Sequence, residues 1–429
     1  MSSTHSPGSA AVSAAVSAAA AALLARPANA YNSISVMKFG GSSFATRLQI
    51  EAVCACIGQR LAENGPQHRI VCVVSAPSGL TEQYRDTLLA LNPTPSDRLI
   101  DAGLPLADSV GSVLVAGALQ ALGLSATVAL GSQIGLRTDR NYTRAELQSA
   151  VLEPLQALLA THQVVVVPGG QAAAVDTGET TWMGKNSSDL SAIALAAAFG
   201  RDTVEIYSDV PGVYSCDPNM VPDAYPIARL SQRQAVDMSM SGAKVLHHRG
   251  VQFALDKQIR IVCKRNAGDF AIGTILSADE AVAAAVVPDA RSQVFGGAAL
   301  QVAAAVDALE LANVPFVLVQ EDDASVRLVV TCGFFDAPHF LAQRHITLEL
   351  LALRLVSVIT AAGAMLRELV APAQLAARAI QLHATHCRAG GQCTPATATV
   401  TAPAAPLAAP EPTLSARLAV LPQLEAASV

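Results

Sequence analysis

Four short segments of the chain carry residues that can bind an anionic phosphate group. The first comprises residues 38–43 (KFGGSS), where a strand-like run delivers a lysine and then breaks at paired glycines. Such a turn exposes successive backbone N–H groups beside a fixed positive charge, which suits a phosphate chain. Because an ordinary strand-to-helix turn can have the same residues, this segment alone does not decide between the two readings.

The second segment comprises residues 178–189 (GETTWMGKNSSD), a predicted loop rich in hydroxyl and amide groups. A loop of this length is costly in backbone entropy unless a ligand helps to order it. A helix is predicted to begin near Leu190, so Asp189 falls in its first turn. There a carboxylate can cap free N–H groups, orient a substrate amine, or orient Lys38.

The third segment, residues 208–219 (SDVPGVYSCDPN), directly follows a strand-like run. Ligands of open α/β sheets bind beyond the carboxyl ends of the strands, so Ser208 and Asp209 are placed where a nucleotide or a metal would be met. The fourth segment, residues 241–248 (SGAKVLHH), places Lys244 between a glycine and a predicted helix. From there a lysine can reach a phosphate or stay solvated.

The elements that must position these segments alternate along the chain. Strand-like runs cover residues 70–74, 164–167 and 203–207, and helical patterns over 109–122 and 188–199 each stop at a glycine. This alternation predicts an α/β fold with an open, mostly parallel sheet sandwiched by helices.

The pattern changes near residue 276, which divides the chain into predicted domains. We expect a first domain over residues 31–280 and a smaller α+β domain over 290–390. Residues 1–30 are rich in alanine and serine and residues 394–429 in proline and alanine, so both are expected to be disordered tails.

Composition excludes several classes of protein. A net charge of -6, from 28 Lys+Arg against 34 Asp+Glu, argues against a nucleic-acid partner. The longest apolar stretch is alanine interrupted by serine, so we expect no membrane span. Eight dispersed cysteines suit a reduced, cytoplasmic protein. His383, His386, Cys387 and Cys393 lack the paired spacing of a zinc site, and no protein-held metal is expected.

Taken in order, the four segments and Val74-Ser75-Ala76 resemble motifs of the aspartate kinases in the amino acid kinase family, over about residues 34–276. The family motifs are Lys-Phe-Gly-Gly-Thr-Ser, Val-Ser-Ala, Thr-Thr-x-Gly-Arg-Gly-Gly-Ser-Asp, Thr-Asp-Val-x-Gly-Val-Tyr-x-x-Asp-Pro-Arg and Phe-Gly-Ala-Lys-Val-Leu-His-Pro. The resemblance implies the amino acid kinase fold. It also implies ATP- and Mg²⁺-dependent phosphorylation of the side-chain carboxylate of L-aspartate, the first step towards lysine, threonine and methionine or towards a specialised metabolite.

The resemblance also implies roles for individual residues. Catalytic roles fall on Lys38 and Asp189. ATP-binding roles fall on Lys38, Gly40, Gly41, Ser42, Ser208, Asp209, Tyr214 and Lys244. Roles in binding L-aspartate fall on Ser43, Thr81, Asp108, Lys185, Ser188 and Asp189.

Several positions depart from the family pattern, and they fall mainly on the amino-acid pocket. Lys185 replaces an arginine and loses its bidentate fork, and Asn186 and Ser187 replace two glycines. Asp108 stands where the family has a glutamate, Gln171 where it has a phenylalanine, and Asn219 where it has an arginine. These exchanges leave three readings open: an active aspartate kinase, a kinase for a different small acidic amino acid, or an inactive or regulatory paralogue.

The C-terminal third resembles the family more faintly. Residues 313–319 and 355–360 are similar to strands of ACT domains, small βαββαβ units that bind feedback effectors. The resemblance implies a homo-oligomer assembled through this domain. It does not assign the residues that would hold an effector.

Overall fold

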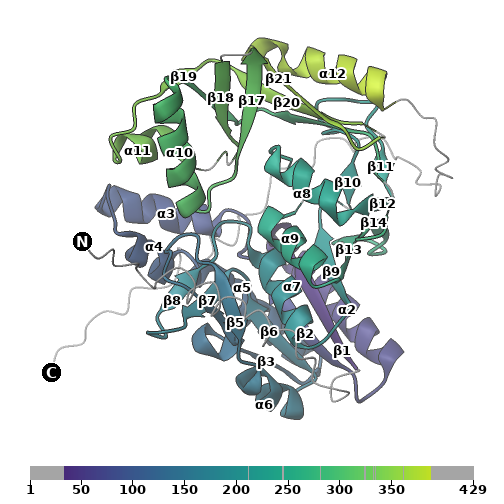
Figure 1. Ribbon diagram of the computed structural model, residues 1–429. Helices are drawn as coiled ribbons and strands as arrows, with labels where there is room; N and C mark the ends of the chain where they lie inside the picture. Colours follow the sequence, from purple (N-terminus) through teal and green to yellow (C-terminus); the bar gives the residue numbers. More distant parts are fainter. Residues whose placement is uncertain are drawn as a thin grey trace, which may run out of the picture.

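The computed structural model describes residues 33–387, apart from residues 211, 244, 245, 281, 323, 324, 332, 334 and 361 (Figure 1). Both predicted tails lie outside the described residues, and so does Lys244. The described part of the chain folds around one large sheet, with smaller sheets beside it.

The large sheet has eight strands in the order β12-β14-β13-β9-β1-β2-β6-β3. All neighbouring pairs are parallel except β13 with β14, so the prediction of a mostly parallel sheet is confirmed. The strands are β1 (Ile34–Phe39), β2 (Arg69–Val74), β3 (Ala126–Val128), β6 (Val164–Pro168), β9 (Thr203–Ser208), β12 (Arg229–Ser231), β13 (Arg260–Arg265) and β14 (Ile272–Ser277).

Helices cover both faces of this sheet, which explains why its strands read as nearly continuous apolar runs. Val36 packs with the helices of one face and Met37 with those of the other. The first group is α6 (Glu153–Thr161), α7 (Ser188–Ala198), α8 (Gln232–Met240) and α9 (His248–Asp256). The second group is α2 (Arg47–Asn64) and α5 (Leu106–Ala121).

A second sheet, in the order β5-β4-β7-β8, lies beside the first and corrects one prediction. Residues 178–189 are not a continuous loop, because residues 180–182 form β8 and pair antiparallel with β7. Threonine and tryptophan favour extended backbone, and this pairing uses that preference. Its strands are β4 (Leu136–Thr138), β5 (Leu147–Ala150), β7 (Gln171–Ala174) and β8 (Thr180–Trp182).

One apolar stretch, Asp97–Ala121, is long and apolar enough by length and composition to cross a membrane, and half of an 18-residue window within it is buried inside the molecule. It is not one straight helix, because α4 (Asp97–Gly103) ends before Pro105 and α5 begins at Leu106. Burial to this extent is typical of a helix that packs on the core.

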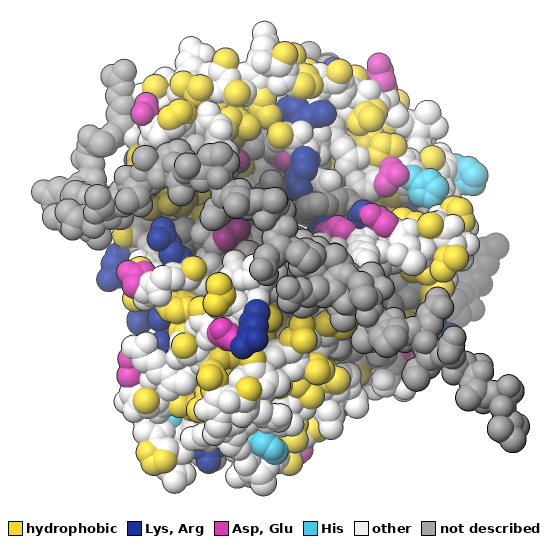
Figure 2. All heavy atoms as spheres, turned by 180° about the vertical axis from the view of Figure 1, so that it is seen from behind, with side chains coloured by type: hydrophobic (Ala, Val, Ile, Leu, Met, Phe, Trp, Pro, Cys, Tyr) yellow, Lys and Arg dark blue, Asp and Glu magenta, His cyan; other side chains and the backbone are white. Residues whose placement is uncertain are grey.

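On the face in Figure 2, basic and acidic side chains are interspersed, so that face shows no broad basic patch.

Beyond β14, six elements follow one another as βαββαβ, the order of ferredoxin-like units. Their four strands form the antiparallel sheet β17-β18-β16-β19, and α10 and α11 pack on it. The strand predicted at 313–319 overlaps β17. The elements are β16 (Gln293–Gly296), α10 (Ala299–Leu311), β17 (Phe316–Asp322), β18 (Ser325–Val330), α11 (Ala337–Ala342) and β19 (Glu349–Leu351).

A three-stranded sheet, β15-β20-β21, connects this unit to the large sheet's domain. Its strands are β15 (Ala285–Asp289), β20 (Arg354–Ile359) and β21 (Met365–Val370), and α12 (Leu375–His386) packs on one face. His383 of α12 is buried and lies 2.9 Å from the hydroxyl of Ser215, so this histidine contacts the third segment. The Val286 N–H also donates to the Ser215 carbonyl at 2.7 Å.

Candidate active site

The centre of the site is an ion pair between Lys38 of β1 and Asp189 of α7. The lysine Nζ lies 2.7 Å from Asp189 Oδ1, and the two side chains are 10% and 9% exposed. Asp189 lies in the first turn of α7, as predicted, and its other oxygen accepts from the His247 N–H at 3.4 Å. Two charges this well buried require each other, because either one alone would be left in a poorly hydrated place.

The glycine turn follows β1 and closes onto the neighbouring strands. The Gly40 N–H donates to the Tyr207 carbonyl at 3.0 Å, and the Ser43 N–H donates to the Gly40 carbonyl at 2.9 Å. Gly41 passes so near the Ala76 carbonyl that a Cβ at this position would lie 2.4 Å from its oxygen. Residue 41 must therefore be glycine for the turn to keep this path.

Ser208 and Asp209 lie at the carboxyl end of β9, beside this turn. The Ser208 hydroxyl donates to Asp209 Oδ1 at 3.0 Å, and the Asp209 side chain is exposed. Tyr214 lies on β10 (Val213–Tyr214), which pairs with β11 (Pro226–Ile227). The buried Thr274 hydroxyl fixes this ribbon, because it accepts from the Val213 N–H at 2.8 Å and donates to the Ile227 carbonyl at 2.6 Å.

On the other side of Lys38, Asp108 lies in the first turn of α5. Its Oδ1 accepts from the Ala76 N–H at 2.9 Å. Burial raises the pKa of Asp108 to about 7, although the Ala76 N–H and the charge of Lys38 act in the opposite direction. Ser188 lies close by, with its hydroxyl 2.7 Å from that of Ser75.

Lys185 is held by an acidic partner that the sequence did not indicate. Its ammonium group pairs with Glu82 of α3 (Leu80–Leu91), the residue after Thr81. The hydrogen bond from Lys185 is the main reason that the pKa of Glu82 lies below its ordinary value. A carboxylate ligand at Lys185 must therefore share this cation with Glu82 or displace it.

Three buried polar residues support the site and were not foreseen. Asp101 is fully buried, and its carboxylate accepts from the Thr143 N–H at 2.7 Å and from the Trp182 N–H at 2.8 Å. Gln171 donates to the Pro105 carbonyl at 2.6 Å, which fixes the start of α5. Asn266 contacts the glycine turn from β13. Only Gln171 carried a signal, since it departs from the family's phenylalanine.

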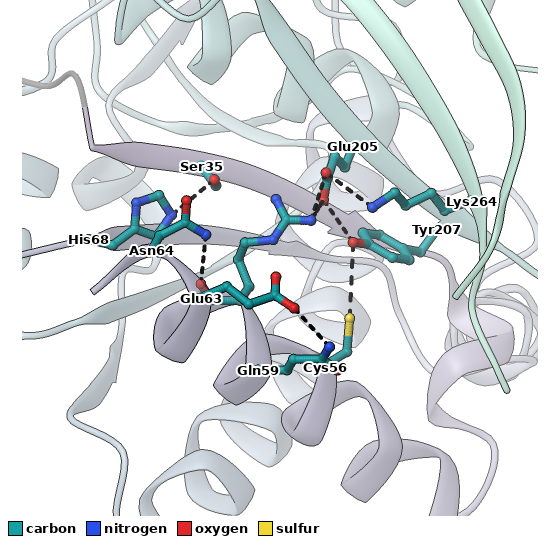
Figure 3. A network of polar contacts seen from close by, with 10 residues as sticks. Ser35, Cys56, Gln59, Glu63, Asn64, His68, Glu205, Tyr207 and Lys264 are labelled. Atoms are coloured by element: carbon teal, nitrogen blue, oxygen red, sulfur yellow. Dashed lines mark hydrogen bonds and ion pairs between the residues drawn. The ribbon is translucent and has the colours of Figure 1, made fainter. Parts of the chain in front are cut away.

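A network on the opposite face of the sheet supports β9 (Figure 3). Glu205 of β9 receives hydrogen bonds from Arg60 at 2.8 Å, Lys264 at 3.2 Å and the Tyr207 hydroxyl at 2.7 Å. Burial alone would raise the pKa of Glu205, but Lys264, Tyr207 and Arg60 outweigh it and lower that pKa. The ring of Tyr207 also stacks on Phe39 at 4.4 Å. The network thus fixes the strand whose carbonyl receives the Gly40 N–H.

Comparison with known proteins places this geometry in a family. The model of the amino acid kinase family matches residues 33–265. The aspartokinase of Corynebacterium efficiens is 31% identical over 323 residues, which are 71% of this chain and 76% of that protein. The chain belongs to the amino acid kinase family, among the aspartokinases. The resemblance and the fold predicted from the sequence are therefore confirmed.

Two further comparisons agree, one over a shorter length and one over a greater length at lower identity. The aspartokinase of Helicobacter pylori is 34% identical over 246 residues, 57% of this chain and 59% of that protein. The structure of Escherichia coli aspartokinase III with aspartate and ADP has a TM-score of 0.66 at 20% identity and covers 82% of this chain and 99% of that one. At this identity the likeness shows a shared fold.

Proposed function

We propose that this chain is an active aspartate kinase, which transfers the γ-phosphoryl group of ATP to the side-chain carboxylate of L-aspartate and forms 4-phospho-L-aspartate. The observation that carries the proposal is the buried Lys38–Asp189 pair at the carboxyl edge of the sheet, in a member of the aspartokinases. The glycine turn beside this pair also keeps the path that brings Gly41 against the Ala76 carbonyl, which favours an active enzyme over an inactive paralogue.

The reaction needs charge neutralisation and positioning more than covalent help. An oxygen of the substrate carboxylate bonds to the γ-phosphorus while the bond to the β–γ bridging oxygen breaks, and ADP leaves with that electron pair. The nucleophile is already ionised, so no proton has to be removed. Lys38 stabilises the charge on the transferring group, and Asp189 holds the lysine in place.

We assign the nucleotide to the side of the site that holds Gly40, Gly41, Ser42, Ser208, Asp209 and Tyr214. The family resemblance adds Lys244, which lies outside the described residues. Mg²⁺ supplies further charge neutralisation on the phosphates when it is bound. The donor set fits this ion, since Asp209 offers an exposed carboxylate at the end of β9. The described residues hold no group of three or more His, Cys, Asp or Glu side chains for a metal, and Mg²⁺ takes its other ligands from phosphates and water.

We assign L-aspartate to the side of the site that holds Asp108, Lys185, Thr81, Ser43 and Ser188. Asp108 would receive the α-ammonium group and Lys185 the α-carboxylate. Because Lys185 also pairs with Glu82, we expect it to bind that carboxylate more weakly than an arginine would.

We also propose that residues 285–387 form an ACT-like regulatory region through which the chain assembles into a homo-oligomer in the cytoplasm. The βαββαβ order of residues 293–351 supports the ACT-like part of this proposal. Size measurement of the full chain, with and without the region after residue 284, tests the assembly.

Trapping the acyl phosphate with hydroxylamine tests the activity. Full-length protein with Mg-ATP and L-aspartate should form the hydroxamate, and Lys38→Ala should abolish it. L-glutamate and other acidic amino acids form the comparison panel, which decides whether the exchanged pocket residues have changed the substrate. Failure with every acidic amino acid would refute the proposed function and favour a regulatory subunit.

A further inference from the structure

Asn266 occupies the junction of three segments at the carboxyl edge of the sheet. It directly follows β13, and its backbone N–H donates to the Ser208 carbonyl at the end of β9 at 2.9 Å. On the other side of β9, the Gly40 N–H donates to the Tyr207 carbonyl at 3.0 Å. Asn266 and the glycine turn therefore donate hydrogen bonds to the same end of β9, from its two sides.

The side chain of Asn266 reaches across β9 to the glycine turn itself. Its Nδ2 lies 2.9 Å from the hydroxyl oxygen of Ser42 and 2.9 Å from that of Ser43. Asn266 is buried, with 9% of its surface exposed, and Ser43 has 1% exposed. The amide nitrogen has two N–H groups, so it can donate to both hydroxyls at once.

This donation determines what the two serines can do. A hydroxyl group has one O–H donor and two acceptor lone pairs. When its oxygen accepts from Asn266, its own proton must point elsewhere. Both hydroxyl protons therefore point away from the Asn266 nitrogen and can be donated to a ligand, and both serines belong to the turn that follows Lys38. Hydrogen-bond donors that already point to the place where charge develops stabilise a transition state, because they do not have to reorient during the reaction.

We propose that Asn266 is a positioning residue that orients the hydroxyl protons of Ser42 and Ser43 away from itself, so that Ser42 can donate to the transferring phosphoryl group and Ser43 to the substrate carboxylate that attacks it. It does not touch the reacting atoms and acts through the two serines. The proposal rests on the proposed kinase function, and it adds a residue to the machinery from a strand that no motif marked.

The central test replaces Asn266 by aspartate, a side chain of nearly the same shape that has a hydrogen-bond acceptor where asparagine has a donor. The carboxylate of Asn266→Asp can only accept, so both hydroxyls would turn their protons toward it and away from the phosphoryl group and the substrate carboxylate. We expect kcat to fall about 100-fold, the lower end of the loss seen when one such donor is removed, while the melting temperature stays near that of the wild type. The added negative charge should also weaken nucleotide binding and thereby raise the KM for ATP.

A double-mutant cycle separates the hydroxyl effect from the charge effect. In a Ser42→Ala, Ser43→Ala background, Asn266→Asp should lower kcat by less than about threefold, because the groups through which it acts are gone. The rise in KM for ATP should persist there. Asn64→Asp is the matched control: this asparagine donates to the Arg60 carbonyl at 2.8 Å at the end of α2, and its exchange should leave kcat unchanged (Figure 3).

The proposal is overturned if Asn266→Asp keeps the wild-type kcat, or if it lowers kcat equally in both backgrounds. Asn266→Ala removes the donor without adding charge, and its kcat is compared in the same two backgrounds. An equal loss of kcat in both backgrounds would again overturn the proposal. Loss of cooperative unfolding in both variants would also overturn it, because Asn266 would then serve the fold rather than the site.

Failure of the kinase function would be recognised separately, because the wild type itself would then form no hydroxamate. In that case the rise in melting temperature caused by Mg-ATP, which carries the γ-phosphoryl group, replaces kcat as the readout. Asn266→Ala should reduce this rise when the two serines are present and should leave it unchanged in their absence. An equal reduction in both backgrounds would overturn the role of Asn266.

Discussion

The two adjacent glycines of the phosphate turn should respond very differently to the same added methyl group. A Cβ on Gly41 would lie 2.4 Å from the Ala76 carbonyl oxygen, a backbone atom that cannot rotate away. Separating the two atoms from 2.4 Å to an ordinary contact of at least 3.4 Å requires a displacement of about 1 Å. A misplacement of about 1 Å near reacting groups can cost on the order of 100-fold in rate. For Gly41→Ala we therefore expect kcat to fall about 10- to 100-fold.

Stability should fall as well, since overpacking at a buried contact typically costs about 1–3 kcal/mol. Gly40→Ala is the matched comparison. Its Cβ would lie 3.5 Å from the Tyr207 carbonyl oxygen and 3.9 Å from Lys38 Nζ, which are ordinary contacts. Its φ of -72° and ψ of 162° suit alanine. We expect this variant to lose at most about fivefold in kcat, roughly 1 kcal/mol of transition-state stabilisation.

Both variants would be assayed by hydroxamate formation at saturating ATP and L-aspartate, with a thermal melt of each protein alongside. The reasoning is refuted if Gly41→Ala keeps kcat within about threefold of the wild type, or if the two variants lose activity equally. Either result would mean that the path of the turn at Ala76 does not control the phosphate site.

Three further predictions concern the charges around the turn. Lys38→Met should lower kcat by about 1,000-fold or more and also lower the melting temperature, because Asp189 then keeps a buried charge without its lysine. Burial raises the pKa of Asp108 to about 7, so the KM for L-aspartate should rise as the pH falls from 8 to 6, and Asp108→Asn should remove this dependence. Asp101→Asn keeps only one acceptor oxygen for the N–H groups of Thr143 and Trp182, so one of these donors loses its acceptor. The free energy of unfolding, measured in urea, should fall by about 1–3 kcal/mol.

Asp101 also gives the last prediction a pH signature. Burial raises its pKa to about 7 in the folded chain, whereas an unfolded aspartate has a pKa of about 4. The neutral form thus favours folding, and its contribution is complete below about pH 4 and is lost as the pH rises through 7. Asp101→Asn should flatten this part of the stability profile.

Contrary results are equally definite. Retained activity in Lys38→Met would remove the lysine from the mechanism. A KM for L-aspartate that is independent of pH in the wild type would remove Asp108 from the amine site. An Asp101→Asn protein with wild-type stability at pH 5 and pH 8 would show that the carboxylate does not hold Trp182.

The parts of the site that were predictable from the sequence depend on local chain order. The lysine and the glycine turn belong to one strand end, and Asp189 opens the helix that follows its loop, so residue type and spacing sufficed. Residue type and position alone allow Asp189 to cap its helix, to orient a substrate amine or to orient Lys38. The structure selects it, because α7 packs against β1.

What the sequence concealed depends on contacts between distant segments. Asn266 reaches serines more than 200 positions earlier, and in its own segment it reads only as a turn residue. Asp101 lies in a short helix whose pattern gives no reason to bury a carboxylate. The acidic partner of Lys185 comes from a helix about 100 residues away. Such contacts follow from topology, which residue patterns do not specify.

The bond between Ser215 and His383 joins α12 to the segment assigned to the nucleotide, so a nucleotide that changes this segment would act on the packing of α12. Ser215 lies in the segment that begins with Ser208 and Asp209, and both partners of the bond are buried. Any ligand that binds more tightly when α12 is seated must raise the affinity for a nucleotide that orders this segment, and the nucleotide must raise the affinity for that ligand by the same factor. Calorimetric titration in either order should therefore measure one coupling free energy.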